Sequence, residues 1–182
     1  MAQPRLPKGM VQVYTGNGKG KTTAALGLAM RALGAGLRVA FLQLLKGSLP
    51  SSELAVAARL GPRLWIKQFQ RQLTPFSMGR GQPTDEDRRA ALQAWEIARK
   101  VMLSGGWDVV VLDEINNILA ARLLCVEEVL AAVRQRPPYV EVICTGRGAP
   151  EELIAAADLV TVMECAKHPF DQGVAARAGI EF

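Results

Sequence analysis

The sequence is poor in aromatic residues, histidine and cysteine, and these shortages narrow its possible functions. Aromatic residues make up 5% of the chain and apolar residues 49%, a balance typical of buried parallel strands covered by alanine- and leucine-rich helices. Cys125, Cys144 and Cys165 lie far apart, without metal-ligand or redox spacing, so we expect reduced core thiols. His168 is the sole histidine, and we expect a structural role for it.

Signals for a membrane, for secretion and for nucleic-acid binding are also lacking. No apolar run reaches membrane-spanning length without charges, and residues 1–8 do not resemble a signal peptide. The net charge is +5, but the 22 basic residues are scattered and form no nucleic-acid-binding tract. We therefore expect a cytoplasmic protein without nucleic-acid or membrane partners. A length of 182 residues suits one α/β domain spanning residues 1–182.

The most informative segment is a glycine-rich loop at residues 15–23, which reads Thr-Gly-Asn-Gly-Lys-Gly-Lys-Thr-Thr. It lies between a strand-like run at 10–14 and an alanine-rich, helix-like run from 22 to about 35. The backbone N–H groups of such a loop bind phosphate together with the positive end of the following helix. Lys21 adds a cation and Thr22 a magnesium-binding hydroxyl.

This loop departs from the usual phosphate-loop pattern at one position. The pattern places a glycine five residues before Gly20, but Thr15 stands there and the glycine is shifted to Gly16. The alternative interpretation is a tight strand-to-helix turn without ligand. Such a turn needs one glycine and no lysine pair, whereas this loop carries Lys19 and Lys21. The segment therefore predicts a nucleotide phosphate site.

A second motif is an apolar strand at 107–114 that ends in two carboxylates, Asp113 and Glu114. Ligands of open α/β sheets bind at the carboxyl ends of the strands. One carboxylate could hold magnesium opposite Thr22, and in hydrolases the next one often orients an attacking water. An isolated Asp-Glu pair would more often cap a helix. Because a phosphate loop precedes it, we interpret this pair as a metal site.

The remaining pattern alternates strands and helices, so it predicts an α/β fold with a mostly parallel central sheet and helices on both faces. Leu26, Ala29, Met30 and Leu33 should form the apolar face of the first helix, and Leu92, Trp95, Ile97, Val101 and Met102 that of the longest one. Strands are expected at 10–14, 38–44, 64–69, 107–114, 140–144 and 159–163, and helices at 22–35, 51–60, from 84 to the glycines at 105–106, 127–134 and 150–157.

The sequence alone does not decide the roles of two segments, and a third has an unusual composition. The loop at 70–83 is either a substrate lid or a surface loop that tucks Phe76 and Met78 into the core. In the turn at 145–148, Arg147 either contacts the ligand or is solvated. The tail from residue 167 holds too many apolar residues for a disordered segment, so we expect a strap packed over the domain.

Taken together, these motifs resemble the P-loop type of corrinoid adenosyltransferase, a family of the cobalamin pathway with a RecA-like fold. The resemblance covers nearly the whole chain. It is carried by the loop at 15–23 with its shifted glycine, Arg-Ala-Leu-Gly at 31–34, Phe-Leu-Gln-Leu-Leu-Lys-Gly at 41–47, Val-Leu-Asp-Glu at 111–114, Thr-Gly-Arg-Gly at 145–148, and Lys-His-Pro-Phe-Asp-Gln-Gly with Gly-Ile-Glu-Phe in the tail.

The resemblance implies transfer of the 5′-deoxyadenosyl group of ATP to the Co(I) centre of a reduced corrinoid, with release of triphosphate. It assigns nucleotide contacts to a set of loop residues and to Arg31: Gly16, Asn17, Gly18, Lys19, Gly20, Lys21, Thr22 and Thr23. Lys19 and Lys21 would neutralise the leaving triphosphate as catalytic residues. Thr22 and Glu114, helped by Asp113, would hold Mg²⁺ or Mn²⁺.

The sequence differs from well-known family members on the corrin side. Their loop before the long helix carries a Phe-Thr-Trp stretch, whereas residues 76–83 here contain no tryptophan. Fewer residues also precede the first strand than the helix covering the site in those members would need. Phe76 and Met78 are our candidates for corrin contact. The family further implies a flavoprotein reductase as electron donor and a homodimer.

Two other functions compete with adenosyl transfer. A P-loop switch or motor would hydrolyse ATP, with Glu114 orienting the water. A regulatory module would bind nucleotide without catalysis. The tail motif and the lack of clustered basic and aromatic residues for strand binding argue against a nucleic-acid motor.

Overall fold

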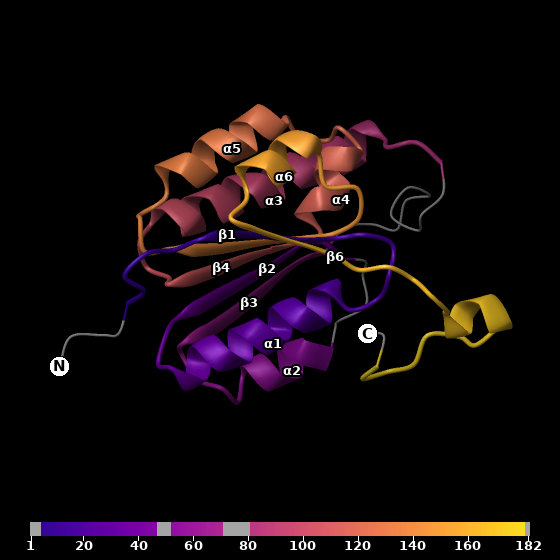
Figure 1. The fold of residues 1–182 in the computed structure, drawn as a ribbon, viewed down its shortest axis with the longest axis horizontal. Helices are drawn as coiled ribbons and strands as arrows, with labels where there is room; N and C mark the ends of the chain where they lie inside the picture. The colour runs from indigo at the N-terminus through magenta and orange to yellow at the C-terminus, as the bar shows by residue number, and fades with distance from the viewer. Residues whose placement is uncertain (1–4, 47–51, 71–80, 181–182) are drawn as a thin grey trace.

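The computed structural model describes residues 5–46, 52–70 and 81–180, and these residues form a central sheet covered by helices on both faces (Figure 1). Six strands lie in the order β3-β2-β4-β5-β1-β6, and all five neighbouring pairs are parallel. The predicted α/β fold is confirmed, and the sheet is parallel throughout. The strands are β1 (Val11–Thr15), β2 (Val39–Lys46), β3 (Leu64–Gln70), β4 (Val109–Asp113), β5 (Glu141–Thr145) and β6 (Leu159–Val162).

The helices divide into two layers. In Figure 1, α1 (Lys21–Gly34) and α2 (Ser52–Ala57) lie below the sheet. The layer above it holds α3 (Asp85–Leu103), α4 (Ile115–Ala120), α5 (Val126–Gln135) and α6 (Glu151–Ala156). Alternate strand residues enter different cores, since Phe41 packs on the α1 side and Leu42 on the other. Burial of both sheet faces explains why the inner strands β1, β2, β4 and β5 read as apolar runs, whereas the residues of the edge strand β6 are exposed.

The buried faces of the two longest helices differ from the prediction. In α1 the buried apolar residues are Ala25, Ala29 and Ala32, whereas Met30 is 52% exposed. In α3, Trp95 and Met102 are buried as expected, but Leu92 and Ile97 are 43% and 40% exposed. Small alanine side chains let each helix backbone approach the sheet closely. The larger aliphatic residues therefore lie on the flanks of the contact.

One helix is missing from the sequence prediction. α4 follows directly on β4 and spans only six residues. Helices this short owe their stability to tertiary contacts rather than to propensity. Its residues Ile115, Ile118 and Leu119 are buried, so α4 is held by its apolar side. That packing brings its two asparagines, Asn116 and Asn117, to the carboxyl ends of the strands.

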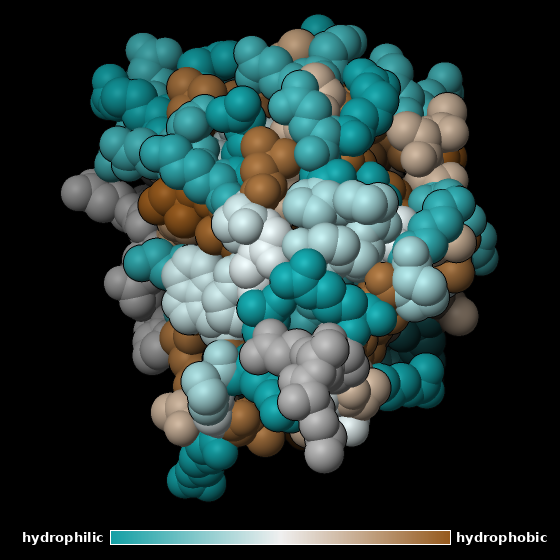
Figure 2. All heavy atoms as spheres, turned by 90° about the vertical axis from the view of Figure 1, so that its left-hand side faces the viewer, coloured by the Kyte–Doolittle hydropathy of each residue, from teal (hydrophilic) through white to brown (hydrophobic). Residues whose placement is uncertain are grey.

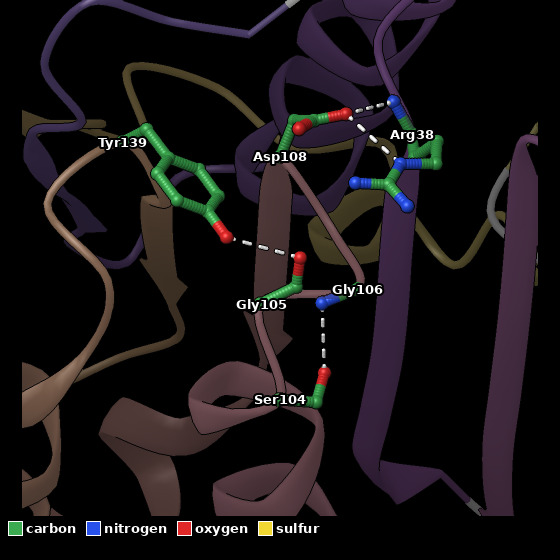
Figure 3. Close-up of polar contacts among 6 residues, drawn as sticks. All are labelled: Arg38, Ser104, Gly105, Gly106, Asp108 and Tyr139. Atoms are coloured by element: carbon green, nitrogen blue, oxygen red, sulfur yellow. Dashed lines mark hydrogen bonds and ion pairs between the residues drawn. The ribbon is translucent and has the colours of Figure 1, made fainter. Parts of the chain in front are cut away.

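Polar contacts also stabilise the amino ends of the strands, on the side opposite to their carboxyl ends (Figure 3). The buried Asp108 carboxylate accepts hydrogen bonds from the backbone N and the Nε of Arg38, at 2.8 and 3.3 Å. The Tyr139 hydroxyl donates to the carbonyl of Gly105, which has a φ of 66°. Figure 2 views this side of the molecule, where hydrophilic side chains surround small, separate apolar patches. These contacts fix the sheet far from the phosphate loop.

The tail leaves the sheet after β6 and does not pack over the domain as predicted. It projects to the right in Figure 1 and contains a short 3-10 helix at Pro169–Gln172. Val174 and Ile180 are 44% and 56% exposed. Their small and polar neighbours form no apolar stripe that could bind the sheet. Among the described residues, no helix is long and apolar enough to cross a membrane.

Candidate functional site

The phosphate loop connects β1 to α1 at the carboxyl edge of the sheet (Figure 1). Thr15 remains in the strand and pairs with Val162, and the chain turns at Gly16, whose φ is 95°. The shifted glycine therefore reflects a strand that extends one residue further. Gly20, with a φ of 119°, caps α1, and no side chain caps its N–H groups. No acidic residue occupies the first turn of α1, so this helix end favours an anion.

The loop also packs tightly on the segment that follows β6. The Gly18 N–H donates to the Met163 carbonyl at 2.7 Å, and the Met163 N–H donates to the Thr15 carbonyl at 2.8 Å. A Cβ atom on Gly18 would lie 2.5 Å from the Glu164 carbonyl oxygen. Gly16 faces Met163 in the same way. Gly16 and Gly18 are therefore both required for close contact between backbones, and Gly16 also for turning.

Lys21 lies inside the loop, with 8% of its surface exposed. Its Nζ donates hydrogen bonds to the carbonyls of Gly16 and Gly18, at 2.8 and 2.6 Å. Burial lowers the pKa of this ammonium group, and the Arg147 charge lowers it further, while Glu114 and Asp113 oppose the shift. The site thus holds a cation that a bound anion would stabilise.

The ends of β4 and β5 and the first turn of α1 meet at the predicted metal residues. Asp113, fully buried at the end of β4, accepts hydrogen bonds at one carboxylate oxygen from the Thr22 hydroxyl at 2.9 Å and the Thr145 hydroxyl at 2.6 Å. The Thr145 oxygen also accepts the Glu114 N–H at 3.0 Å. Glu114 has a left-handed backbone with a φ of 68°. Thr22, Asp113 and Glu114 are therefore assembled as expected.

This set of oxygen donors suits magnesium better than a transition metal. Among residues 5–46, 52–70 and 81–180, no cluster of three or more His, Cys, Asp or Glu side chains could hold a metal by itself. Mg²⁺ usually takes one or two protein carboxylates and completes its shell with water and substrate phosphates. One hydroxyl and two carboxylates beside a phosphate loop fit that chemistry.

The two asparagines of α4 hold the turn at residues 145–148, which follows β5. Buried Asn116 donates from Nδ2 to the Tyr14 and Gly146 carbonyls, both at 3.2 Å. Asn117 accepts the Arg147 N–H at 2.5 Å through its side-chain oxygen. The sequence analysis overlooked both residues. Their only signal was two adjacent asparagines separated by one residue, Ile115, from a strand-terminal carboxylate pair.

A cavity of about 490 Å³ opens over the loop. Its walls come from the phosphate loop, α1, α2, the ends of β4 and β5, and the tail: Asn17, Gly18, Lys19, Gly20, Lys21, Thr22, Thr23, Leu26, Ser52, Glu53, Glu114, Asn117, Arg147, His168, Gly179 and Ile180. His168 and Ile180 show that part of the tail reaches the site. Of the residues that sequence reasoning left open, Arg147 lies on the cavity side.

Some candidates lie elsewhere. Gly16 and Asp113 support the cavity from behind without lining it. Arg31 is exposed in the last turn of α1. It follows Lys21 by ten residues, or about 15 Å of helix, and does not line the cavity. Phe76 and Met78 fall outside the described residues. Glu53 and Ser52 of α2 line the cavity although no sequence motif marked them.

Comparison with known proteins identifies the family of this chain. A family model described as "ATP:corrinoid adenosyltransferase BtuR/CobO/CobP" matches residues 7–182. A corrinoid adenosyltransferase from Escherichia coli (strain K12) is 37% identical over 182 residues, covering 100% of this chain and 90% of that protein. One from Pseudomonas aeruginosa is 37% identical over 187 residues, covering 100% of this chain and 88% of that protein.

A solved structure supports the fold alone. The flagellar accessory protein FlaH from Methanocaldococcus jannaschii superimposes with a TM-score of 0.51 at 16% sequence identity. The match covers 86% of this chain and 72% of FlaH. A parallel sheet with a phosphate loop after β1 is the RecA-like P-loop fold that the sequence implied. With the family match over nearly its whole length, the chain belongs to the ATP:corrinoid adenosyltransferase family.

Proposed function

We propose that this protein transfers the 5′-deoxyadenosyl group of ATP to the Co(I) centre of a reduced corrinoid and releases triphosphate. The observation that carries the proposal is one cavity in which a phosphate loop, Lys21 and the Thr22–Asp113–Glu114 cluster converge. The chain's membership of the adenosyltransferase family gives that cavity its chemistry.

In this reaction the corrinoid substrate is the nucleophile. The electron pair of Co(I) forms the cobalt–C5′ bond. The C5′–O5′ bond breaks, and triphosphate leaves with the two electrons of the broken bond. The protein therefore needs no serine, cysteine or activated water. Instead, the protein must hold C5′ in line with cobalt and stabilise the growing negative charge on triphosphate.

The loop residues have distinct roles in this account. Asn17, Lys19 and Gly20 line the cavity at the end of α1, where N–H groups and the helix dipole favour phosphate. Lys21 and Lys19 supply positive charge to the leaving group. On binding, Lys21 would exchange its loop carbonyl partners for phosphate oxygens. Arg147, on the cavity side of the turn, adds a further cation.

Thr22, Glu114 and Asp113 would hold Mg²⁺, with Mn²⁺ as a possible substitute. When bound, the metal neutralises charge on the triphosphate. Thr22 and Glu114 lie on the cavity wall, and Asp113 holds the Thr22 hydroxyl from behind. Asp113 would then act mainly by orienting Thr22. These roles rest on the hard oxygen chemistry of the donors.

Family resemblance supports further proposals on partners. A flavoprotein reductase would deliver the electron that produces Co(I), and the active species would be a homodimer. A cytoplasmic location agrees with three free cysteines; Cys144 is buried, whereas Cys125 and Cys165 are exposed, so the expectation of core thiols is wrong for these two. Phe76 and Met78 remain candidates for corrin contact, and Arg31 for a nucleotide contact.

Incubation with ATP, Mg²⁺ and a corrinoid under strong reductant tests the function. We expect a light-sensitive adenosylcorrinoid and one triphosphate per product. An ATPase would instead release orthophosphate without corrinoid, and a regulatory module would give neither product. Absence of a cobalt–carbon product when Co(I) is verified spectroscopically would refute the proposal.

A further inference from the structure

Thr145, at the carboxyl end of β5, has no role in the sequence motifs described above except as the first residue of a turn. Its side chain is fully buried between the ends of β4 and α1. The hydroxyl makes two hydrogen bonds, one donated to Asp113 at 2.6 Å and one accepted from the Glu114 N–H at 3.0 Å. A single oxygen therefore contacts both consecutive carboxylate residues.

The Glu114 backbone explains why this contact matters. Two non-glycine residues in the described chain have positive φ, Glu114 and Arg122. Arg122 ends α4 in a hydrogen-bonded turn, with its N–H bonded to Leu119 and the Leu123 N–H bonded to Ile118. Such turns commonly use this conformation. Glu114 instead lies between a strand and a helix, where a left-handed backbone is strained for a non-glycine residue.

We propose that Thr145 is a positioning residue for the metal site: its hydroxyl holds Glu114 in its left-handed conformation and fixes the Asp113 carboxylate behind Thr22. This proposal rests on the metal role given above to Thr22, Asp113 and Glu114. The new element is Thr145, which links Asp113 and Glu114 to β5 through hydrogen bonds to its hydroxyl. Without the Thr145 hydroxyl, the Glu114 N–H loses its acceptor and the chain at that point can relax.

The contact with Asp113 becomes more important when a metal is bound. Thr22 now donates its hydroxyl hydrogen to Asp113. A metal held by Thr22 would take an oxygen lone pair of its hydroxyl and would limit the direction in which that hydroxyl can donate. The Thr145 hydroxyl makes no contact with the cavity, so its bond to Asp113 is kept. Removing such a supporting contact typically weakens metal binding about 10- to 100-fold.

Thr145→Val tests this role because it keeps the side-chain shape and removes the hydroxyl. Thr145→Ser restores the hydroxyl. Thr161→Val, at an exposed threonine of β6, is the matched control for replacing threonine in a strand. For each full-length variant, ATP affinity is measured by calorimetry with EDTA and with Mn²⁺. Mn²⁺ bound in the presence of ATP is counted by electron paramagnetic resonance.

We expect Thr145→Val to lose about 10- to 100-fold of the Mn²⁺-dependent gain in affinity and to keep its affinity in EDTA. Thr145→Ser and Thr161→Val should behave like the wild type. If Thr145→Val melts at a lower temperature but keeps the full Mn²⁺-dependent gain, the hydroxyl is merely structural and the inference is wrong. If Thr145→Val does not fold, the same measurements are made on Thr145→Ala, which also lacks the hydroxyl and has a smaller side chain.

The wild-type protein separates this inference from the proposed function. A wild type that gains no ATP affinity from Mn²⁺ contradicts the proposed metal site itself, and the role of Thr145 fails with it. A wild type that does gain affinity, together with an unaffected Thr145→Val variant, contradicts the role of Thr145 alone.

Discussion

At the scale of single residues, the site depends on a lysine whose charge is destabilised before the ligand arrives. Burial, with the Arg147 charge, lowers the Lys21 pKa below its ordinary value of 10.5. A triphosphate placed beside this ammonium group favours the charged form and raises the pKa again. ATP binding should therefore be coupled to proton uptake wherever the pH lies between the two pKa values.

This coupling predicts how ATP affinity changes in alkaline solution. Below the pKa of free Lys21 the group is already charged, so affinity is constant. Above it, affinity should fall by up to about tenfold per pH unit, because each binding event takes up a proton. The fall should begin below pH 10.5. Calorimetry in two buffers with different ionisation enthalpies measures this uptake directly.

Two variants make the measurement specific to Lys21. Lys21→Arg keeps a permanent charge and should bind ATP without proton uptake. Lys100→Met, at an exposed lysine in the last turn of α3, should keep the wild-type uptake. A wild-type affinity that stays constant up to about pH 10.5 would show that Lys21 is not the coupled group.

Sequence reasoning identified the charged groups of the site better than the groups that orient them. Lys21, Thr22, Asp113 and Glu114 occur in recognisable order, and the structure brings all four together. Thr145, Asn116 and Asn117 act through one hydroxyl or one amide each. A single neutral hydrogen-bonding group leaves no periodicity or charge pattern in a sequence, so their roles appear only when distant strands are placed side by side.

At the scale of elements, the phosphate loop and the segment after β6 form one unit. Gly18 has an ordinary backbone conformation, yet an added Cβ atom would lie 2.5 Å from the Glu164 oxygen and 2.7 Å from its carbonyl carbon. Backbone atoms cannot give way as a flexible side chain can. The loop and the chain at 163–164 would therefore have to separate if Gly18 carried a side chain.

Gly18→Ala tests this coupling, with Gly27→Ala as control. We expect Gly18→Ala to lower the melting temperature and to break the Gly18–Met163 hydrogen bond, a loss of about 1–3 kcal/mol including the displaced contact. Gly27 lies in α1 with nothing within 4 Å of an added Cβ atom. Alanine there should stabilise the helix by up to about 1 kcal/mol. Equal melting temperatures for Gly18→Ala and wild type would contradict this close packing of the phosphate loop on residues 163–164.

The elements themselves were predictable to different degrees. The inner strands β1, β2, β4 and β5 were found because a parallel strand buried on both faces is apolar throughout, whereas the edge strand β6 is exposed. The buried helix faces were predicted only in part: Ala29, Trp95 and Met102 are buried as expected, whereas Met30, Leu92 and Ile97 are exposed because close helix–sheet packing selects alanine. The helix α4 was missed because six residues are too few to show a period. The tail was expected to pack as a strap over the domain, but most of its described residues are exposed, and it reaches the domain where His168, Gly179 and Ile180 line the cavity.

At the scale of the whole molecule, the strand order β3-β2-β4-β5-β1-β6 explains why the site forms where it does. The parallel strands end at one edge, so Thr15, Asp113 and Thr145 become near neighbours although the sequence separates them widely. The tail returns to the same edge and lines the cavity with His168, Gly179 and Ile180. One wall of the cavity is therefore formed by the phosphate loop, and another wall is formed by the tail.

In the proposed reaction, the phosphate loop holds a leaving group rather than a transferred phosphate. The most direct measurement follows the ATP carbon that would bond to cobalt. ATP labelled with ¹³C at C5′ is incubated with the protein, Mg²⁺ and chemically reduced corrinoid, and the products are examined by ¹³C and ³¹P nuclear magnetic resonance. We predict that the label moves into an adenosylcorrinoid with a cobalt–carbon bond while intact triphosphate appears in equal amount. Label that remains in ADP, with orthophosphate released, would contradict the account.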